Sequence, residues 1–233
     1  MNVFPERTSL HLEQTDGSSL AIPRRETERY LGYRKITPSA DVAARIQACE
    51  QQLHARSSPK AAWQAFPLKF SENGHLHAAG MDISSAGLLR NCRNCSSIVL
   101  MAATIGPGVD YLIRRAEAVS MTDAAIYQAA GAAMVEEWCD QLNRKIKDYM
   151  KKTYGLAARP RFSPGYGDLP LDLQRDFFRI LNLPHTCGMS LGDTLLMSPS
   201  KSVTAFIGFA AAEDNCIPAG CEVCGKDNCD YHR

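Results

Sequence analysis

Hydrophobic residues recur every three or four positions in two stretches of the chain, which predicts two amphipathic helices. The first begins after a cap at Ser39 or Asp41. The second runs from about 122 to 152, with Thr122 or Asp123 as its cap, and buries a broad apolar face. Shorter helices are expected at 24–31, at 84–90 and over about 12 residues from Asp172.

Other stretches have the pattern of β-strands. Residues 96–104 are almost uniformly apolar over the length of one strand, which predicts a strand buried on both faces. Residues 63–83 have the pattern of extended segments that turn at Asn73 and Gly74, and further extended segments are expected at 189–196 and 202–209. This mixture of helices and strands predicts the α+β class.

The length and charge of the chain exclude several kinds of protein. Its 233 residues suit one large domain with appendages, and we place an N-terminal extension at 1–22, a globular domain at 23–212 and a cysteine-rich tail at 213–233. The 26 lysines and arginines nearly cancel the 25 aspartates and glutamates, so neither nucleic acid nor an anionic membrane is the expected partner.

The expected compartment is the cytoplasm. The longest strongly apolar run, residues 98–106, is too short for a membrane span of about 20 residues, and the first residues lack an apolar signal region. Nine cysteines in a cytosolic chain favour metal binding, redox chemistry or reduced thiols over a disulfide framework.

Residues 159–168 form a loop that combines prolines, glycines and an arginine. Glycine lets the backbone approach a ligand closely, and proline reduces the entropy lost when a ligand is held. The planar guanidinium of Arg161 suits a carboxylate, and Tyr166 adds a ring face and a hydroxyl. Composition alone leaves two interpretations: a rigid turn whose arginine binds nearby protein oxygens, or a ligand site.

The sequence of this loop resembles that of a known family. Residues 161–166, RFSPGY, resemble the Arg-x-x-x-Gly-Tyr element of the S-adenosylmethionine-binding activation domain of cobalamin-dependent methionine synthase. Residues 188–203, GMSLGDTLLMSPSKSV, resemble that domain's Gly-Ile-x-Leu-Thr-Glu-Ser-x-x-Met-x-Pro-x-x-Ser-Val segment, and VEEW at 135–138 resembles its acidic helix. Stand-alone relatives of the domain are more similar still, at 29–33, at 103–106 and in the closely spaced cysteines of the ending.

The resemblance implies a twisted, mainly antiparallel sheet with long helices packed on it. It also implies a reactivation function, in which the domain presents S-adenosylmethionine while an electron donor reduces cob(II)alamin, and methyl transfer traps the reduced cobalt. The chain has no room for a cobalamin-binding domain, so it is expected to act in trans on a separate corrinoid methyltransferase. Methyl transfer would then occur between its ligand and the cobalt of the partner, so we leave open whether the chain itself is an enzyme.

The resemblance also implies a ligand site. The carboxylate of S-adenosylmethionine would bind Arg161 and its positive charges would lie near Glu136, while the family's N-terminal aspartate has no clear counterpart. Glu137, on the next helix face, is the alternative to Glu136, and an acid on such a helix is otherwise a solvated surface residue. The implied ligand-binding residues are Glu136, Arg161, Ser163, Gly165, Tyr166 and Ile207, the last matched by position alone.

The tail holds a dense array of thiols. Cys221, Cys224 and Cys229, with Cys216 upstream, have the close spacing of ligands to Zn²⁺ or to an iron–sulfur cluster. Zn²⁺ would be structural, a [4Fe–4S] cluster would add a one-electron carrier, and reversible thiol chemistry or an unliganded tail is the remaining interpretation. The array also supports an alternative function: a metal-binding interaction module that keeps the fold without binding S-adenosylmethionine.

The other residues that could be reactive or bind a ligand are assigned structural roles. Cys92 and Cys95 are expected to be small, half-buried residues, and His75 and His77 to be surface residues on one strand face. Residues 104–108 are expected to form a tight turn from strand to helix. Three further cysteines in periodic segments are expected in the core: Cys49, Cys139 and Cys187.

Overall fold

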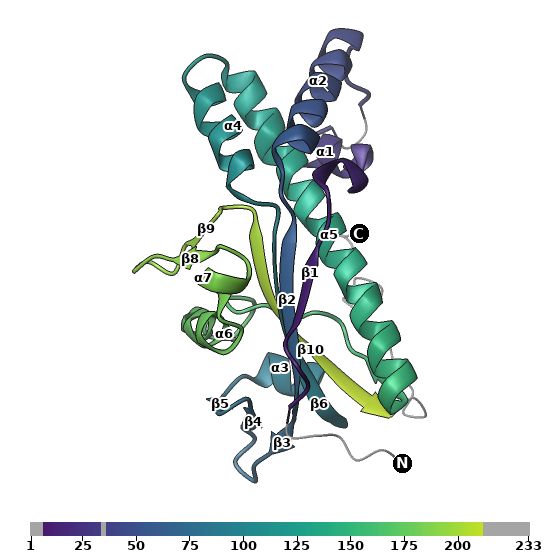
Figure 1. The fold of residues 1–233 in the computed structure, drawn as a ribbon, viewed down its shortest axis with the longest axis vertical. Coiled ribbons are helices and arrows are strands. Elements are labelled where there is room, and N and C mark those ends of the chain that lie inside the picture. The colour runs from purple at the N-terminus through teal and green to yellow at the C-terminus, as the bar shows by residue number, and fades with distance from the viewer. Residues whose placement is uncertain (1–6, 34–35, 212–233) are drawn as a thin grey trace.

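An antiparallel five-stranded sheet lies at the centre of the computed structural model, which describes residues 7–33 and 36–211. The strand order is β1-β2-β6-β10-β7. The long middle strands are β2 (Lys60–Pro67), β6 (Cys95–Thr104) and β10 (Ser202–Ala211), and the edges are β1 (His11–Gln14) and β7 (Leu156–Ala158). The sheet contains strands from both ends of the described chain, because β1 and β10 both belong to it (Figure 1).

The middle strands are buried on both faces, as their unbroken apolar pattern predicted for β6. Alternate side chains of β6 and β10 belong to two separate core clusters, one on each face of the sheet. Val99, Met101 and Ile207 lie in the cluster on the side of the long helix, whereas Leu100 and Phe206 lie in the opposite one. The molecule therefore has three layers, with the sheet in the middle.

Long helices cover one face of the sheet (Figure 1). The longest, α5 (Met121–Tyr154), runs along the sheet and buries Trp138, Leu142 and Ile146 against it. α4 (Pro107–Glu117) also packs there, and Cys49 of the neighbouring helix α2 contacts α5 through a small satellite cluster. The other helices on this side are α1 (Arg24–Tyr30) and α2 (Ala40–Arg56), together with a 3-10 turn at Gly17–Ser19.

Short elements cover the opposite face. They surround a second core in which Phe177 packs edge-to-face on Phe206, with ring centroids 4.6 Å apart. The elements are the helices α3 (Ala86–Asn91), α6 (Gln174–Ile180) and α7 (Leu183–Thr186), the 3-10 turn Leu171–Leu173, and the strands β3 (Lys69–Phe70), β4 (Leu76–Ala78), β5 (Met81–Ile83), β8 (Ser190–Leu191) and β9 (Met197–Ser198).

Two details differ from the prediction for helices. Ser120 caps α5 by accepting a hydrogen bond from the Asp123 N–H, so Thr122 and Asp123 are not the cap; the Asp123 carboxylate instead binds Arg45. The helix expected over about 12 residues from Asp172 is split, because Asn182 adopts a left-handed φ of 50° ahead of Pro184.

The segment expected to be extended at 189–196 is mostly a hairpin. Only β8 is a strand within it; β8 pairs with β9, which begins just after this segment, and the chain reverses through Leu195, whose φ is 64°. Within 1–22, the stretch that we placed outside the globular domain, residues 11–14 form β1 and Leu20 is buried in the helix-side core. Among the residues that the structure describes, no helix is long and apolar enough to cross a membrane.

Candidate functional site

The loop at 159–168 continues the edge of the central sheet. β7 pairs with the end of β10, and the Arg159 N–H donates to the Gly208 carbonyl at 2.7 Å. Phe162 and Phe206 then exchange two backbone hydrogen bonds of 2.9 Å, which form an isolated antiparallel bridge. The Phe162 side chain packs toward the core with Phe206, and its neighbour Arg161 reaches the opposite side, toward α5.

The far end of the loop is closed and anchored. The Gly165 N–H donates to the Leu169 carbonyl at 2.9 Å, and Gly165 has a φ of 84°, a left-handed conformation that favours glycine. The Asp168 carboxylate accepts hydrogen bonds from the Ser85 hydroxyl and from the N–H groups of Ala86 and Gly87, at the start of α3. These bonds fix the loop to the start of a helix that lies 81 to 83 residues earlier in the sequence.

Arg161 lies against the acidic face of α5. Its Nη2 atom is 3.2 Å from Glu136 Oε2 and 2.9 Å from Asp140 Oδ1. Two carboxylates four residues apart on one helix repel each other, and the guanidinium offsets that repulsion. The cluster of Glu136, Asp140 and Arg161 thus places two carboxylates around one guanidinium nitrogen.

The Nη1 nitrogen of Arg161 has no hydrogen-bond partner among the residues that the structure describes. It is buried, while Nη2 is bound to both acids. A buried donor without an acceptor costs about 1–3 kcal/mol, more when the group is charged. Arg161 therefore binds protein carboxylates through Nη2, as the structural interpretation of the loop predicts, and its Nη1 keeps an unused hydrogen-bond donor.

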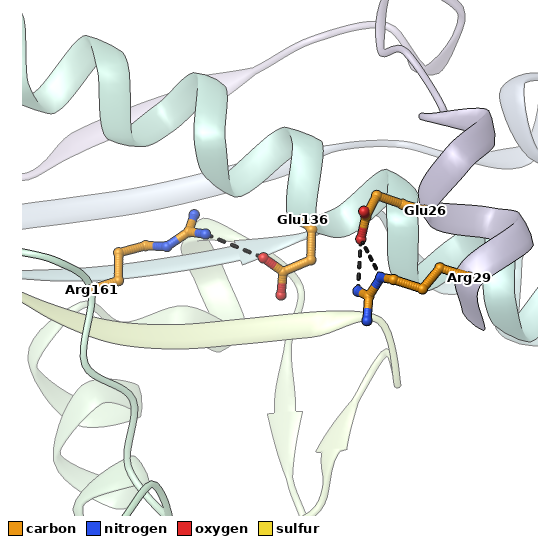
Figure 2. Close-up of polar contacts among 4 residues, drawn as sticks. All are labelled: Glu26, Arg29, Glu136 and Arg161. Atoms are coloured by element: carbon orange, nitrogen blue, oxygen red, sulfur yellow. Dashed lines mark hydrogen bonds and ion pairs between the residues drawn. The ribbon is translucent and has the colours of Figure 1, made fainter. Parts of the chain in front are cut away.

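A second ion pair lies on the other side of Glu136 in the view of Figure 2. Arg29 of α1 donates through Nε and Nη2 to Glu26 Oε2, at 3.1 and 2.7 Å. The hydrogen bond to Glu26 raises the pKa of the Arg29 guanidinium. The packing of α1 against α5 thus brings acids and arginines from three distant segments to one side of the sheet.

Of the predicted ligand-binding residues, the structure brings Glu136 and Arg161 into direct contact. Ser163 is partly buried, and its carbonyl closes the turn by accepting from the Tyr166 N–H. Tyr166 is 68% exposed and lies edge-to-face on Phe162 at 5.4 Å, so its ring is displayed at the surface. Ile207 differs from the others, because its side chain is fully buried in the helix-side core and contributes packing. Gly165 lies at the exposed turn beside Leu171.

Sequence reasoning missed one member of this cluster. Asp140 lies one helical turn after Glu136, so the i, i+4 spacing was a usable signal. It also missed the nearby pair of Glu26 and Arg29, because nothing local in the sequence indicates that α1 packs against α5. Glu137, the alternative to Glu136, instead binds Arg144 and Gln141 along the helix surface.

The thiols that the structure describes are buried. Cys92 and Cys95 pack in the second core, and the pKa of the Cys92 thiol is raised by its hydrogen bond with Cys95 and by burial. The three cysteines expected in the core lie there, and burial raises the pKa of the Cys139 thiol to about 12. A thiol with a raised pKa is poorly ionised, so Cys92 and Cys139 suit packing better than nucleophilic chemistry.

The two histidines and the turn at 104–108 have the structural roles predicted for them. Nδ1 of His75 and of His77 lie 2.8 and 3.6 Å from the same oxygen of Asp82, on an exposed hairpin. Gly106, with a φ of 87°, makes the predicted turn into α4. Within residues 7–33 and 36–211 no three His, Cys, Asp or Glu side chains are arranged to hold a metal ion, and Cys216, Cys221, Cys224 and Cys229 lie outside these described residues.

Comparison with known proteins identifies the fold. No family model and no curated protein matches the sequence. A solved structure, the MetH reactivation domain bound to AdoHcy, matches with a TM-score of 0.65 and 13% sequence identity, over 86% of this chain and 78% of that chain. The predicted α+β class, with an antiparallel sheet and long helices, is confirmed, and the chain has the fold of the MetH reactivation domain.

Proposed function

We propose that this protein binds S-adenosylmethionine and reactivates a cobalamin-dependent methionine synthase in trans. The observation that carries the proposal is the buried, unpartnered Nη1 of Arg161 beside the Glu136 carboxylate. It occurs in the RFSPGY segment that resembles the family's ligand-binding motif. The solved neighbour supports the same ligand class, because that domain was determined with AdoHcy bound.

The charges of the cluster fit this ligand. S-adenosylmethionine carries a carboxylate, an ammonium and a sulfonium, and the cluster around Arg161 offers a guanidinium beside two carboxylates. The carboxylate would accept a hydrogen bond from Arg161 Nη1, and the positive groups would lie near Glu136. Glu26, on the neighbouring helix α1, is a further acid on the same side of the sheet, where it is paired with Arg29.

The rest of the loop supplies the apolar part of the site. Tyr166 displays an exposed ring that suits stacking beside the ligand, and Gly165 leaves the backbone without a side chain at the turn. Bound S-adenosylmethionine supplies a methyl group for the cobalt of the partner. The contribution of this chain is to hold that ligand in a fixed orientation.

Titration of S-adenosylmethionine into the purified protein tests the ligand. We expect saturable binding, and we expect Arg161→Ala to weaken it by about 2–4 kcal/mol, because a charged hydrogen-bonded partner is lost. That loss corresponds to roughly 30-fold to 1,000-fold in Kd. Arg179→Ala is the matched control, since Arg179 makes a surface pair with Asp176 and should leave binding unchanged. Equal binding by the Arg161→Ala variant would exclude the assigned role.

A reactivation assay tests the partner. We expect the protein to restore turnover of a methionine synthase inactivated as cob(II)alamin, when S-adenosylmethionine and an electron donor are present. The Arg161→Ala variant should restore less at the same ligand concentration. The alternative function, a metal-binding interaction module, depends on cysteines outside the described residues and stays a prediction; under it, Arg161→Ala would be silent and Cys224→Ser would abolish the interaction.

A further inference from the structure

Asp140 shares the same nitrogen of Arg161 with Glu136, and its contact is the shorter of the two. The distances to Nη2 are 2.9 Å from Asp140 Oδ1 and 3.2 Å from Glu136 Oε2. Both acids project from one face of α5, because they are four residues apart. Arg161 therefore has two anchors on one edge and an unpartnered, buried Nη1 on the other.

We infer that Asp140 is a positioning residue for the carboxylate-binding edge of Arg161. This inference rests on the proposed function. A ligand that brings a positive group to Glu136 competes with Arg161 for that carboxylate, since both cations need the same oxygens. Asp140 keeps hold of Nη2 while Glu136 turns toward the ligand, so Nη1 stays directed at the carboxylate of the ligand.

The surroundings of Arg161 restrict the conformations open to its side chain. Its side chain is only 17% exposed, and the backbone at its neighbour Phe162 is fixed to β10 by two hydrogen bonds. Asp140, at 42% side-chain exposure, is anchored on a long helix whose next residue but one, Leu142, lies in the core. A rigid helix and a rigid sheet edge thus set the distance between the two charges, which is the condition for a preorganised anion site.

Three variants and two ligands test this role. Asp140→Asn removes the charge with little change of shape, Asp140→Glu keeps a carboxylate, and Asp148→Asn is the matched control at an exposed position of the same helix. The ligands are S-adenosylmethionine and decarboxylated S-adenosylmethionine, which lacks only the carboxylate. Calorimetric titration of the full chain gives Kd for each pair, and thermal unfolding shows whether each variant is folded.

We expect Asp140→Asn to raise Kd for S-adenosylmethionine by about tenfold and to leave Kd for the decarboxylated ligand nearly unchanged. Asp140→Glu should recover part of the loss, and Asp148→Asn should bind as the unmodified protein does. The preference for the ligand with a carboxylate therefore shrinks most in Asp140→Asn, less in Asp140→Glu and not in Asp148→Asn.

Other results would distinguish a failure of the positioning role from a failure of the proposed function. If the unmodified protein binds S-adenosylmethionine and Asp140→Asn binds it equally well, the positioning role is wrong and the proposed function stands. If Asp140→Asn weakens both ligands alike, Asp140 supports the fold of the site and does not position Arg161. If the unmodified protein binds neither ligand, the proposed function fails and this inference fails with it.

Discussion

Arg161 shows what single residues contribute and what sequence can say about them. Its residue type and its RFSPGY context predicted an anion-binding role, and its place on the side of α5 follows from the alternation of side chains along a sheet edge. Its partners were harder to predict: Glu136 was implied by a resemblance, and Asp140 was not predicted at all. Contacts between a loop and a helix face depend on tertiary packing, which local patterns do not encode.

Gly208 is a residue whose role appears only in three dimensions. It lies in β10 next to Ile207, and a Cβ there would be 2.9 Å from the sulfur atoms of both Cys92 and Cys95. Such a contact forces buried neighbours to shift, so we expect Gly208→Ala to lower the free energy of unfolding by about 1–3 kcal/mol. Urea unfolding measures the change.

Gly192→Ala is the control for that measurement. A Cβ at Gly192 would meet its nearest atom at 3.6 Å, an ordinary contact, so little change in the free energy of unfolding is expected. Equal stability of Gly208→Ala and the unmodified protein would show that the two thiols do not pack against β10 as described.

At the scale of elements, the loop at 159–168 is held by its neighbours at both ends. One end pairs with β10, and the other end caps α3 through the Asp168 carboxylate. The sequence predicted both the loop and the short helix after Ser85, yet not that one residue would join them. Similarly, the position of α5 was predicted but its cap was not, because Arg45 from α2 binds the Asp123 carboxylate.

The Asp168 contact predicts a pH dependence. Hydrogen bonds from the Ser85 hydroxyl, then from Gly87 and Ala86, lower the pKa of Asp168 below its usual range. The stabilisation is therefore complete above the unfolded-state pKa of about 3.9 and is lost as the pH falls through the lower pKa of the folded state. We expect Asp168→Asn to be less stable than the unmodified protein at pH 7, with a difference that shrinks below about pH 4.

Urea midpoints measured from pH 7 down to pH 3 check this prediction. Asp176→Asn is the matched control, since Asp176 pairs with Arg179 at the surface. A difference between Asp168→Asn and the unmodified protein that stayed constant over this range would mean that the charge of Asp168 does not cap α3.

At the scale of the whole molecule, the fold was predictable because several motifs spread along the chain resembled one family. Periodicity alone gave the α+β class and the main helices, whereas the antiparallel sheet came from that resemblance. The strand order was not predicted, since its pairings join residues far apart in sequence. The edge strand β1 came from a segment with a mixed polar pattern, which carries little strand signal. The match to a solved reactivation domain at 13% identity shows that this architecture is kept while the sequence varies.

A crystal structure of the protein with S-adenosylhomocysteine tests the central claim most directly. The account predicts a carboxylate oxygen of the ligand within about 3 Å of Arg161 Nη1, with Asp140 still bound to Nη2 and the adenosine beside Tyr166. A ligand bound elsewhere, for example in the hollow of about 480 Å³ beside His77 and Asp82, with Arg161 unchanged, would contradict it.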